Sequence, residues 1–437
     1  MAEERLTTSE LRDVWALLSG DERIEGFRQV EPTDADDFFL GLSSREQASM
    51  LRSMQPGERR LWFRLLPPDD AADAIQQLPK DERGAWLDLL DDASRGETVA
   101  LLAYEEDAAG GLMSPRFARL RPEMTVDEAV RYLRRQARER LETIYYAYVL
   151  DQEQRLCGVV SFRDLFAASS NTLLADVMHT SVVSVEDTLD QESVARIMAE
   201  HDLNAVPVVD EQGRMKGIVT IDDVVDVVQQ AATEDIQKLG GMEALETPYM
   251  QTGLLALIKK RAGWLSVLFL GELLTANAMG RYEHDIQRAV VLALFVPLII
   301  SSGGNSGSQA TTLIIRAMAL GEIELRDWFR IVRRELAAGF LLGLILASLG
   351  FLRVVGGQSL FGTYGEHYLR VGFTVALSLL GVVTWGTVTG SMLPFLIRRI
   401  GFDPASASAP FVATLVDVLG LMIYFNVGRL LLSGALL

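Results

Sequence analysis

The sequence predicts a multidomain protein: a helical solenoid, a tandem α/β module, and an all-α membrane domain of five transmembrane helices. Three observations predict this. Residues 1–250 hold 49 Asp and Glu against 26 Lys and Arg, whereas residues 251–437 hold 10 acids, 15 basic residues and nearly all the long apolar runs. Two internal repeats lie within the acidic part, at 43–102 and 113–231. An acidic soluble region is therefore joined to a membrane domain.

The first repeat consists of five consecutive 12-residue units, from SSREQASMLRSM to DDASRGETVALL, over residues 43–102. Each unit opens with Ser, Pro or Asp near a helix start and closes with apolar residues, which predicts a capped, short amphipathic helix. Helices this short are marginal alone and must stack on one another. We therefore assign residues 1–112 to an N-terminal helical superhelix, with a plain helical bundle as the alternative.

The second repeat aligns VLDQEQRLCGVVSFRDLF (149–166) with VVDEQGRMKGIVTIDDVV (208–225) at an offset of 59 residues. Each copy predicts a strand, a turn, a strand and a helix, preceded by a helix and a further strand. This pattern resembles a tandem pair of CBS domains, a regulatory module that commonly senses nucleotides or ions, over residues 113–231. Residues 232–261 are then expected to form a connecting helix that runs to the membrane face.

Five apolar segments follow, within residues 262–437, and each is long enough to cross a hydrocarbon core of about 30 Å. They are 262–280, 288–318, 335–355, 369–397 and 408–434. Clusters of Lys and Arg at 259–261, 326–334 and 398–399 then fall on one side, which the positive-inside rule assigns to the cytoplasm. We expect a protein of the cytoplasmic membrane with its N-terminus inside and its C-terminus outside. The missing N-terminal apolar segment agrees with this orientation.

Composition also argues against several function classes. An acidic surface of this size does not suit nucleic acid. Cys157 is the single cysteine, which excludes an intramolecular disulfide and a cysteine metal cluster, and the four histidines are scattered, which disfavours a zinc site. We find no phosphate-binding loop and no nucleophile–base set, so we do not expect an enzyme.

Asp417 lies inside the apolar run 410–428, with its nearest charged neighbours at Asp403 and Arg429. A charge at the bilayer centre costs roughly 2.5–3.5 kcal/mol on insertion scales, so it usually faces a watery path or a partner. The second segment contains SSGGNSGSQ (301–309), a polar, small-residue stretch that must face protein or water. Close helix packing is the alternative for this stretch, although it does not explain Asn305 and Gln309.

The domain order, together with GGNSGSQ, ATEDIQKLGG and ETIYYAYV, resembles the MgtE family of magnesium channels over residues 30–437. The resemblance implies a homodimer with one central pore, in which Asp417 of each subunit holds hydrated Mg²⁺. It also implies a pore lined by Asn305, Ala409 and Ala413, although Ala409 replaces a polar residue expected in some members. Glu272, in the first segment, is either a second ion contact or a protonated buried acid, and the sequence leaves both open.

The resemblance further implies regulatory Mg²⁺ bound among the helical domain, the CBS pair and the connecting helix, holding a closed state. A solvated acidic face is the ordinary explanation for such a charge run. The candidate ligands are Asp190, Glu192, Asp202, Asp223, Asp226, Glu234 and Asp235, with Asp69 and Asp73 as a pair from the helical domain. Ala231 stands where the family can have an acid. Asp222 matches a CBS position that can hold a nucleotide ribose, so ATP is a candidate ligand.

Together these features predict a Mg²⁺ channel of the lipid bilayer that abundant cytoplasmic Mg²⁺ closes, because ions that prefer the closed arrangement shift the population toward it. One alternative is a divalent cation exchanger coupled to H⁺ or Na⁺, with Asp417 and Glu272 as titrating carriers. A second alternative is a CBS-regulated membrane sensor that conducts nothing.

Overall fold

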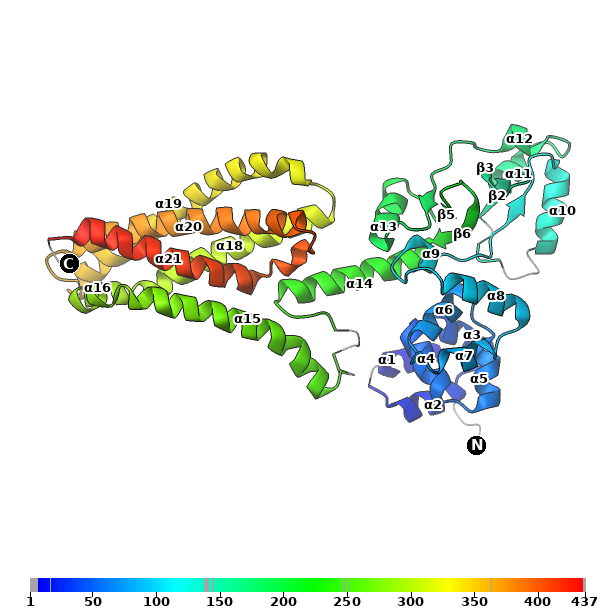
Figure 1. Ribbon diagram of the computed structural model, residues 1–437, viewed down its shortest axis with the longest axis horizontal. Helices are drawn as coiled ribbons and strands as arrows, with labels where there is room; N and C mark the ends of the chain where they lie inside the picture. The colour runs from blue at the N-terminus through cyan, green and yellow to red at the C-terminus, as the bar shows by residue number, and fades with distance from the viewer. Residues whose placement is uncertain are drawn as a thin grey trace. The chain divides into compact units, whose positions relative to one another are not determined.

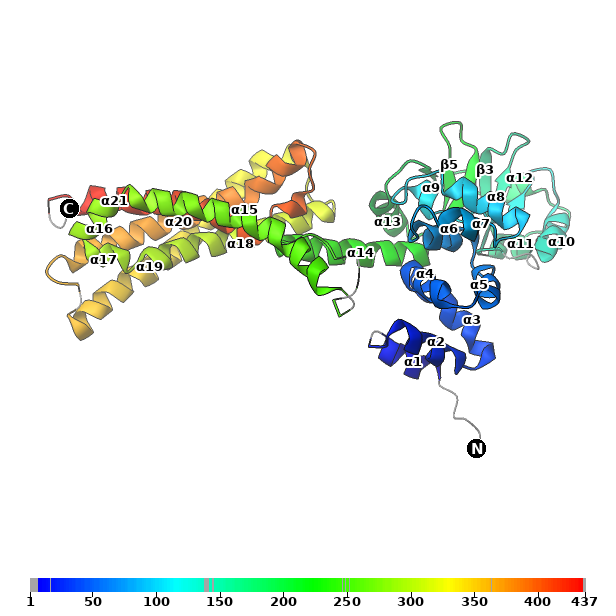
Figure 2. The same cartoon turned by 60° about the horizontal axis from the view of Figure 1, so that its bottom comes forward.

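The computed structural model describes residues 7–15, 17–136, 141–143, 145–245, 247, 249–250, 252–362 and 364–434. The chain divides into two compact units, Met1–Ala231 and Ala232–Leu437, which we call the first and second unit. Figure 1 and Figure 2 show their elements from two directions.

The first unit begins with a series of short helices. They are α1 (Thr8–Trp15), α2 (Gly20–Arg28), α3 (Pro32–Leu40), α4 (Ser44–Ser53), α5 (Pro56–Phe63), α6 (Pro68–Gln76), α7 (Arg83–Leu87) and α8 (Asp92–Leu101). Each predicted 12-residue unit contains one of the helices α4 to α8. The start signals act as expected: Ser43 and Glu46 form a reciprocal capping box, and Pro56 and Pro68 occupy first-turn positions.

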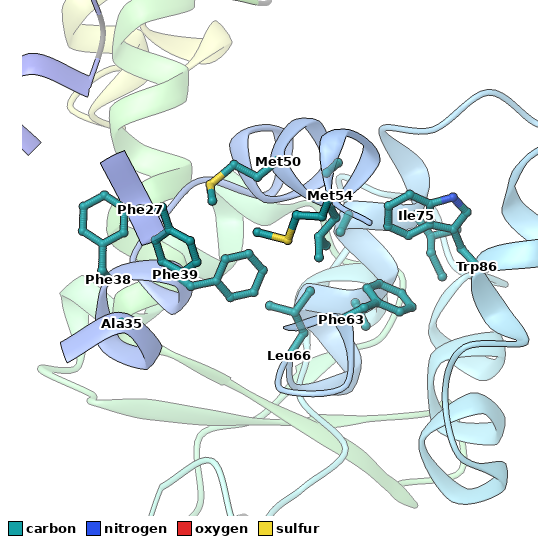
Figure 3. Packing of buried hydrophobic residues seen from close by; sticks show 14 of the residues in the cluster. Phe27, Ala35, Phe38, Phe39, Met50, Met54, Phe63, Leu66, Ile75 and Trp86 are labelled. Atoms are coloured by element: carbon teal, nitrogen blue, oxygen red, sulfur yellow. The ribbon is translucent and has the colours of Figure 1, made fainter. Parts of the chain in front are cut away.

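Alternate helices of this series pack on one another, with α2 on α4, α4 on α6 and α6 on α8. Their shared core is rich in aromatic rings. Phe27, Phe38 and Phe39 gather at one end, and Phe63 meets Trp86 edge to face at a centroid distance of 5.3 Å (Figure 3). Such large buried rings supply the apolar area that helices of five to ten residues cannot bury alone.

The α/β repeat forms two sheets of the same order. The first contains β1 (Arg119–Leu120), β2 (Tyr146–Leu150) and β3 (Leu156–Ser161), and the second contains β4 (Val185–Glu186), β5 (Ala205–Val209) and β6 (Met215–Thr220). In each sheet the first pair is parallel and the second antiparallel. Their helices are α9 (Ala109–Leu112), α10 (Val126–Gln136), α11 (Phe162–Ala167), α12 (Leu174–Val177) and α13 (Gln191–Glu200).

The connecting helix differs from the prediction over 232–261. Helix α14 (Ile221–Leu239) starts directly after β6 and ends at Leu239, and the next helix begins only at Leu254. Gly241 explains the stop, because it adopts a left-handed φ of 72° and its N–H bonds to the Lys238 carbonyl, while the Met242 N–H bonds back to Gln237. This is a Schellman-type helix end, which glycine forms without strain.

The second unit is helical. It contains α15 (Leu254–Gly280), α16 (Glu283–Arg288), α17 (Val290–Ala293), α18 (Val296–Ala319), α19 (Trp328–Phe361), α20 (Tyr368–Arg399) and α21 (Ala409–Leu432), with short 3₁₀ turns η1 (Leu325–Asp327) and η2 (Pro404–Ser406). Helix α20 packs on α18, α19 and α21, and α15 packs on α21 (Figure 2).

Four segments of the described chain are long and apolar enough to cross a membrane: Val290–Ala319, Leu325–Phe361, Tyr368–Arg399 and Ala409–Leu432. The predicted segments at 335–355 and 369–397 lie within two of these four, and those at 288–318 and 408–434 overlap the other two and extend one or two residues beyond them. The remaining predicted span, 262–280, lies in α15, which is 27 residues long but is not among the four. A fifth span therefore stays a prediction.

Glycines set the close approach of α18 and α20. A Cβ atom added to Gly390 would overlap the carbonyl oxygen of Gly307, and one added to Gly386 would overlap that of Gly303. Thr311 extends the contact, since its hydroxyl donates to the Gly390 carbonyl at 2.7 Å. Small residues thus let the two backbones touch, as in membrane helix pairs.

Candidate functional site

Helix α21 presents Asp417 beside a glycine of α18. A Cβ atom on Gly304 would lie 3.2 Å from the Cβ of Ala413 and 3.7 Å from Oδ1 of Asp417. One turn earlier on α21, the carbonyl of Ala409 accepts a hydrogen bond from the Ser308 hydroxyl at 3.1 Å. The absence of a side chain at Gly304 therefore lets α18 pack closely against Ala413 and the Asp417 carboxylate.

A row of polar side chains runs along the exposed face of α18. It comprises Ser301, Asn305, Gln309 and Thr312, all exposed in the single chain. The Asn305 side-chain amide donates to the Ser301 hydroxyl at 3.3 Å. Because lipid cannot satisfy such groups, a helix that spans a membrane turns this face toward protein or water. We call these four residues the polar row.

Helix α15 lies against α21 in a defined register. The indole N–H of Trp264 donates to the Ser408 hydroxyl at 3.0 Å, and a Cβ on Gly271 would meet Cγ2 of Thr414 at 2.5 Å. Glu272 follows Gly271, and its charge acts on Asp417. Glu272 thus lies next in sequence to a direct contact between α15 and α21.

In the first unit, acids from α6, the loop before β2 and the start of α14 form a group that we call the acidic cluster. Its members are Asp69, Asp70, Asp73, Glu142, Asp222 and Asp223, and each acts electrostatically on at least one other. Asp69 is only 8% exposed, and its Oδ1 has no hydrogen-bond partner. A buried acceptor without a donor is costly unless a proton or cation satisfies it.

The pKa values of the acidic cluster also indicate that its carboxylates are stabilised by a bound proton or cation. Burial, reinforced by the charge of Asp223, raises the pKa of Asp70 to about 8 and that of Asp73 to about 7. Burial, followed by the charge of Asp69, raises the pKa of Asp223 to about 8, although a hydrogen bond from the Thr220 hydroxyl at 2.8 Å opposes the shift. Near neutral pH the acidic cluster therefore takes up protons unless a cation replaces them.

The last turn of α14 carries a second set of charges, within the second unit. The Lys238 ammonium lies 2.5 Å from Oε1 of Glu234 and 2.5 Å from Oδ2 of Asp403, which precedes η2. Burial, followed by the charge of Asp403, raises the pKa of Asp235. The carboxylates of α14 and the η2 segment are thus bridged by an ammonium group.

Comparison with known proteins gives matches along most of the chain. The family model described as a divalent cation transporter, MgtE, matches residues 296–427, that of the MgtE intracellular N domain matches 6–107, and the CBS domain model matches 109–171 and 174–230. The magnesium transporter MgtE of Thermus thermophilus is 46% identical over 79% of this chain and 74% of its own length. That of Enterococcus faecalis is 37% identical over 77% of this chain and 71% of its own length.

The chain belongs to the MgtE family of magnesium transporters. The predicted resemblance is thereby confirmed, as are a cytoplasmic MgtE N domain, the CBS pair and a membrane domain with the four candidate spans. Among solved structures, the cytosolic domain of the Mg²⁺ channel MgtE in complex with ATP is 44% identical, covers 51% of this chain and 91% of its own, and has a TM-score of 0.48.

With the MgtE architecture in place, the predicted ligands can be located. Asp69, Asp73 and Asp223 come together in the acidic cluster, and their role as Mg²⁺ ligands stays a prediction. Asp226 lies one turn after Asp222 on α14, and burial together with the Asp222 charge raises its pKa. Half of the residues of the acidic cluster were thus among the ligands predicted from the sequence.

The structure places three other predicted ligands at the ends of α13. Asp190 caps the helix by accepting from the Ser193 N–H at 2.8 Å, and Glu192 lies in the first turn. Asp202 follows the last turn with a left-handed φ of 52°. A helix of ten residues is about 15 Å long, so Asp202 and Asp190 do not share an ion.

Asp222 was predicted to hold a nucleotide ribose, and the structure places it among acids. Its charge acts on Asp70, Glu142 and Asp223. Negative neighbours favour a cation over a phosphate group.

Sequence reasoning missed Asp70, Glu142 and Asp403. One of them lies in a motif of the resemblance, since Glu142 opens ETIYYAYV, whereas Asp403 lies in the segment between α20 and α21. Within the described ranges, no three His, Cys, Asp or Glu side chains are arranged to hold one metal ion directly. Mg²⁺ suits such a loose arrangement, because it keeps several waters and binds through one or two carboxylates.

Proposed function

We propose that this MgtE protein is a homodimeric Mg²⁺ channel and that Asp417 is its ion contact. The observation that carries the proposal is the carboxylate of Asp417 packed against Gly304 of α18, the helix that also carries the exposed polar row. A hydrated Mg²⁺ ion binds through one or two carboxylates, and polar side chains suit its water shell. Two such carboxylates, one from each subunit, would repel each other alone and be stabilised by the cation between them.

A second copy of the chain explains the exposed faces. In a membrane, the polar row of α18 needs water or protein beside it, and a pore between two copies supplies both. In the first unit, α14 exposes Ile221, Val225 and Val228, which are 43%, 46% and 53% exposed and recur at helical spacing. Such an apolar stripe is typical of a protein–protein contact. Both units therefore favour a dimer.

The topology follows from the same proposal. We propose that α15 is a fifth span, because it is 27 residues long and packs along α21, one of the four candidate spans. An odd number of spans puts the N-terminus in the cytoplasm and the C-terminus outside. We also keep the term solenoid for the stacked helices α2, α4, α6 and α8 as a proposal.

The gate is proposed to close when cytoplasmic Mg²⁺ binds the acidic sites. The acidic cluster supplies Asp69, Asp70, Asp73 and Asp223, whose raised pKa values reflect unmet demand for positive charge. A cation that neutralises these carboxylates favours the arrangement in which they lie close. When the sites are empty, repulsion favours a spread arrangement, so Mg²⁺ shifts the population toward closure.

ATP binding through Asp222 stays a prediction. The acids around Asp222 repel phosphate groups, so a nucleotide would have to direct its phosphates away from the acidic cluster. The exchanger alternative also stays open to test, because Asp417 and Glu272 are both carboxylates that could carry protons.

Mg²⁺ influx into liposomes, with equal pH and equal Na⁺ on both sides, tests the proposal. We expect influx with the wild type and its loss in Asp417→Ala. Influx only under an imposed H⁺ or Na⁺ gradient would favour the exchanger. Gradient-free influx that survives Asp417→Ala would remove Asp417 from the ion path, and no influx under either condition would favour a non-conducting sensor.

A further inference from the structure

Glu272 is a carboxylate on the apolar helix α15, and the proposed channel does not use it. Its side chain is exposed in the single chain, among the apolar residues Leu270, Leu273 and Leu274. An acid on a membrane helix is unfavourable in contact with lipid, so it faces a water-filled path or a partner. The residues that α15 contacts determine which of the two applies to Glu272.

The register of α15 on α21 shows these contacts. Trp264 contacts Ser408 at 3.0 Å, and two turns later the Gly271 position meets Thr414, so the two helices run side by side in the same direction. Thr414 and Asp417 are three residues apart and therefore neighbours on one face of α21. Glu272 follows Gly271 and thus lies beside the turn that carries Asp417.

Two further observations agree with this placement. The charge of Glu272 acts on Asp417, so the two carboxylates are close enough for electrostatic coupling. One turn after Gly271, the hydroxyl of Thr275 is buried at 7% exposure and has no hydrogen-bond partner. Helix α15 therefore carries two oxygen-bearing side chains in the register of Asp417. Among the described residues, none forms a hydrogen bond with the Thr275 hydroxyl.

We infer that Glu272 is a second acidic contact for the cation at Asp417, so that each subunit presents one carboxylate from α15 and one from α21 to the same hydrated ion. The inference rests on the proposed channel and deepens it. Four carboxylates around one divalent ion, acting through its water shell, strengthen the selection of divalent over monovalent cations because the attraction scales with ion charge. Glu272 sets ion affinity, whereas Asp417 is required for conduction.

The test uses the full chain in liposomes with no H⁺ or Na⁺ gradient, and measures influx over a range of external Mg²⁺. The variants are Glu272→Gln and Glu272→Asp, with Asp417→Ala as reference. The matched control is Glu366→Gln, which removes an exposed glutamate from the segment between α19 and α20. We expect Glu272→Gln to raise the half-saturating Mg²⁺ concentration about three- to tenfold, where tenfold equals about 1.4 kcal/mol, with maximal influx unchanged.

The charge-keeping variant Glu272→Asp separates charge from structure. We expect it to shift the half-saturating concentration less than Glu272→Gln, with Glu366→Gln behaving as the wild type. If Glu272→Gln does not fold, Glu272→Asp decides the test alone. Because it keeps the charge, we expect its Mg²⁺ affinity to be close to that of the wild type. Equal half-saturation in wild type and Glu272→Gln, with influx still lost in Asp417→Ala, overturns the inference and leaves the channel intact.

A wild type without gradient-free influx defeats the channel instead. The inference is then decided by calorimetric titration of the detergent-solubilised full chain with Mg²⁺. Glu272→Gln and Asp417→Ala must each weaken or remove a binding event that Glu366→Gln retains. Unchanged binding in Glu272→Gln overturns the inference.

Discussion

The acidic cluster makes the stability of the first unit depend on pH in a calculable way. The folded-state pKa values of about 7 for Asp73 and about 8 for Asp70 and Asp223 lie far above the ordinary value of 3.8. Between pH 4 and 8 the folded chain therefore binds more protons than the unfolded chain. Stability falls as pH rises through this range, and the loss is complete above pH 8.

The magnitude follows from these pKa values by linkage. Raising the pH from 6 to 8 without divalent cations costs about 1.4 kcal/mol at Asp73 and about 2.3 kcal/mol at each of Asp70 and Asp223. Water entering the cluster reduces the total, so we expect about 3 kcal/mol. For a unit of this size, 1 kcal/mol moves the Tm by about 2–4 °C, which predicts a fall of about 6–12 °C.

The assay is thermal unfolding of the detergent-solubilised full chain, followed by tryptophan fluorescence, since Trp15, Trp62 and Trp86 pack in or against the helical core. Scans at pH 6 and pH 8 are run with chelator and with Mg²⁺. At pH 8, Mg²⁺ at 100 times its Kd should restore about 2.7 kcal/mol. At pH 6 the gain should be smaller, because protons compete for the same oxygens.

Variants connect this behaviour to particular residues. Asp73→Asn removes one group of raised pKa and should reduce the difference between pH 6 and pH 8 by about 0.7 kcal/mol, its share of the reduced total. Asp81→Asn, at an exposed acid of the same helical domain, should leave the difference unchanged. A chelated wild type that melts at the same temperature at both pH values would refute the reasoning, as would equal stabilisation by Mg²⁺ at pH 6 and pH 8.

Two further predictions concern the second unit. Lys238→Met removes the ammonium that pairs with Asp403 at 2.5 Å, so the Mg²⁺ concentration that closes the channel should fall about three- to fivefold, as expected for an exposed ion pair. Liposome influx at varied internal Mg²⁺ measures this concentration. An unchanged or higher closing concentration would contradict competition between Mg²⁺ and Lys238. Gly390→Ala places a methyl group against the backbone of Gly307 and should lower the melting temperature of the purified protein by several degrees. Gly356→Ala, where nothing lies within 4 Å, is its control and should have little effect.

The repeats could be predicted because their signals are local. Each 12-residue unit carries its own cap, as Ser43 and Asp91 show, and each contains one helix. The 59-residue offset recurs from β2 to β5 and from β3 to β6, since strand periodicity and turn residues repeat with it. The end of α14 was predicted wrongly, because the mixed charge of residues 232–261 hid the stop that Gly241 imposes.

The composition of the acidic cluster could be predicted only in part. The resemblance supplied Asp69, Asp73 and Asp223, whereas Asp70 and Glu142 join through tertiary approach of segments more than 70 residues apart in the chain. The same holds for Glu272, whose partner Asp417 is 145 residues away. The sequence identifies acids in unusual positions, but only tertiary packing determines which of them interact electrostatically.

The acidic cluster and the charges at the end of α14 differ in what a regulatory cation would have to displace. In the proposed mechanism, Mg²⁺ at the acidic cluster would compete with protons on groups such as Asp70 and Asp223, whose pKa is raised to about 8. At the end of α14 it competes with Lys238, whose pKa is raised by its hydrogen bonds to Asp403 and Glu234, so that it stays charged throughout. Closure governed by the acidic cluster therefore becomes more sensitive to Mg²⁺ as pH rises from 6 to 8, whereas closure governed by the Lys238 site does not. The pH dependence of gating thus reports which set of carboxylates limits closure.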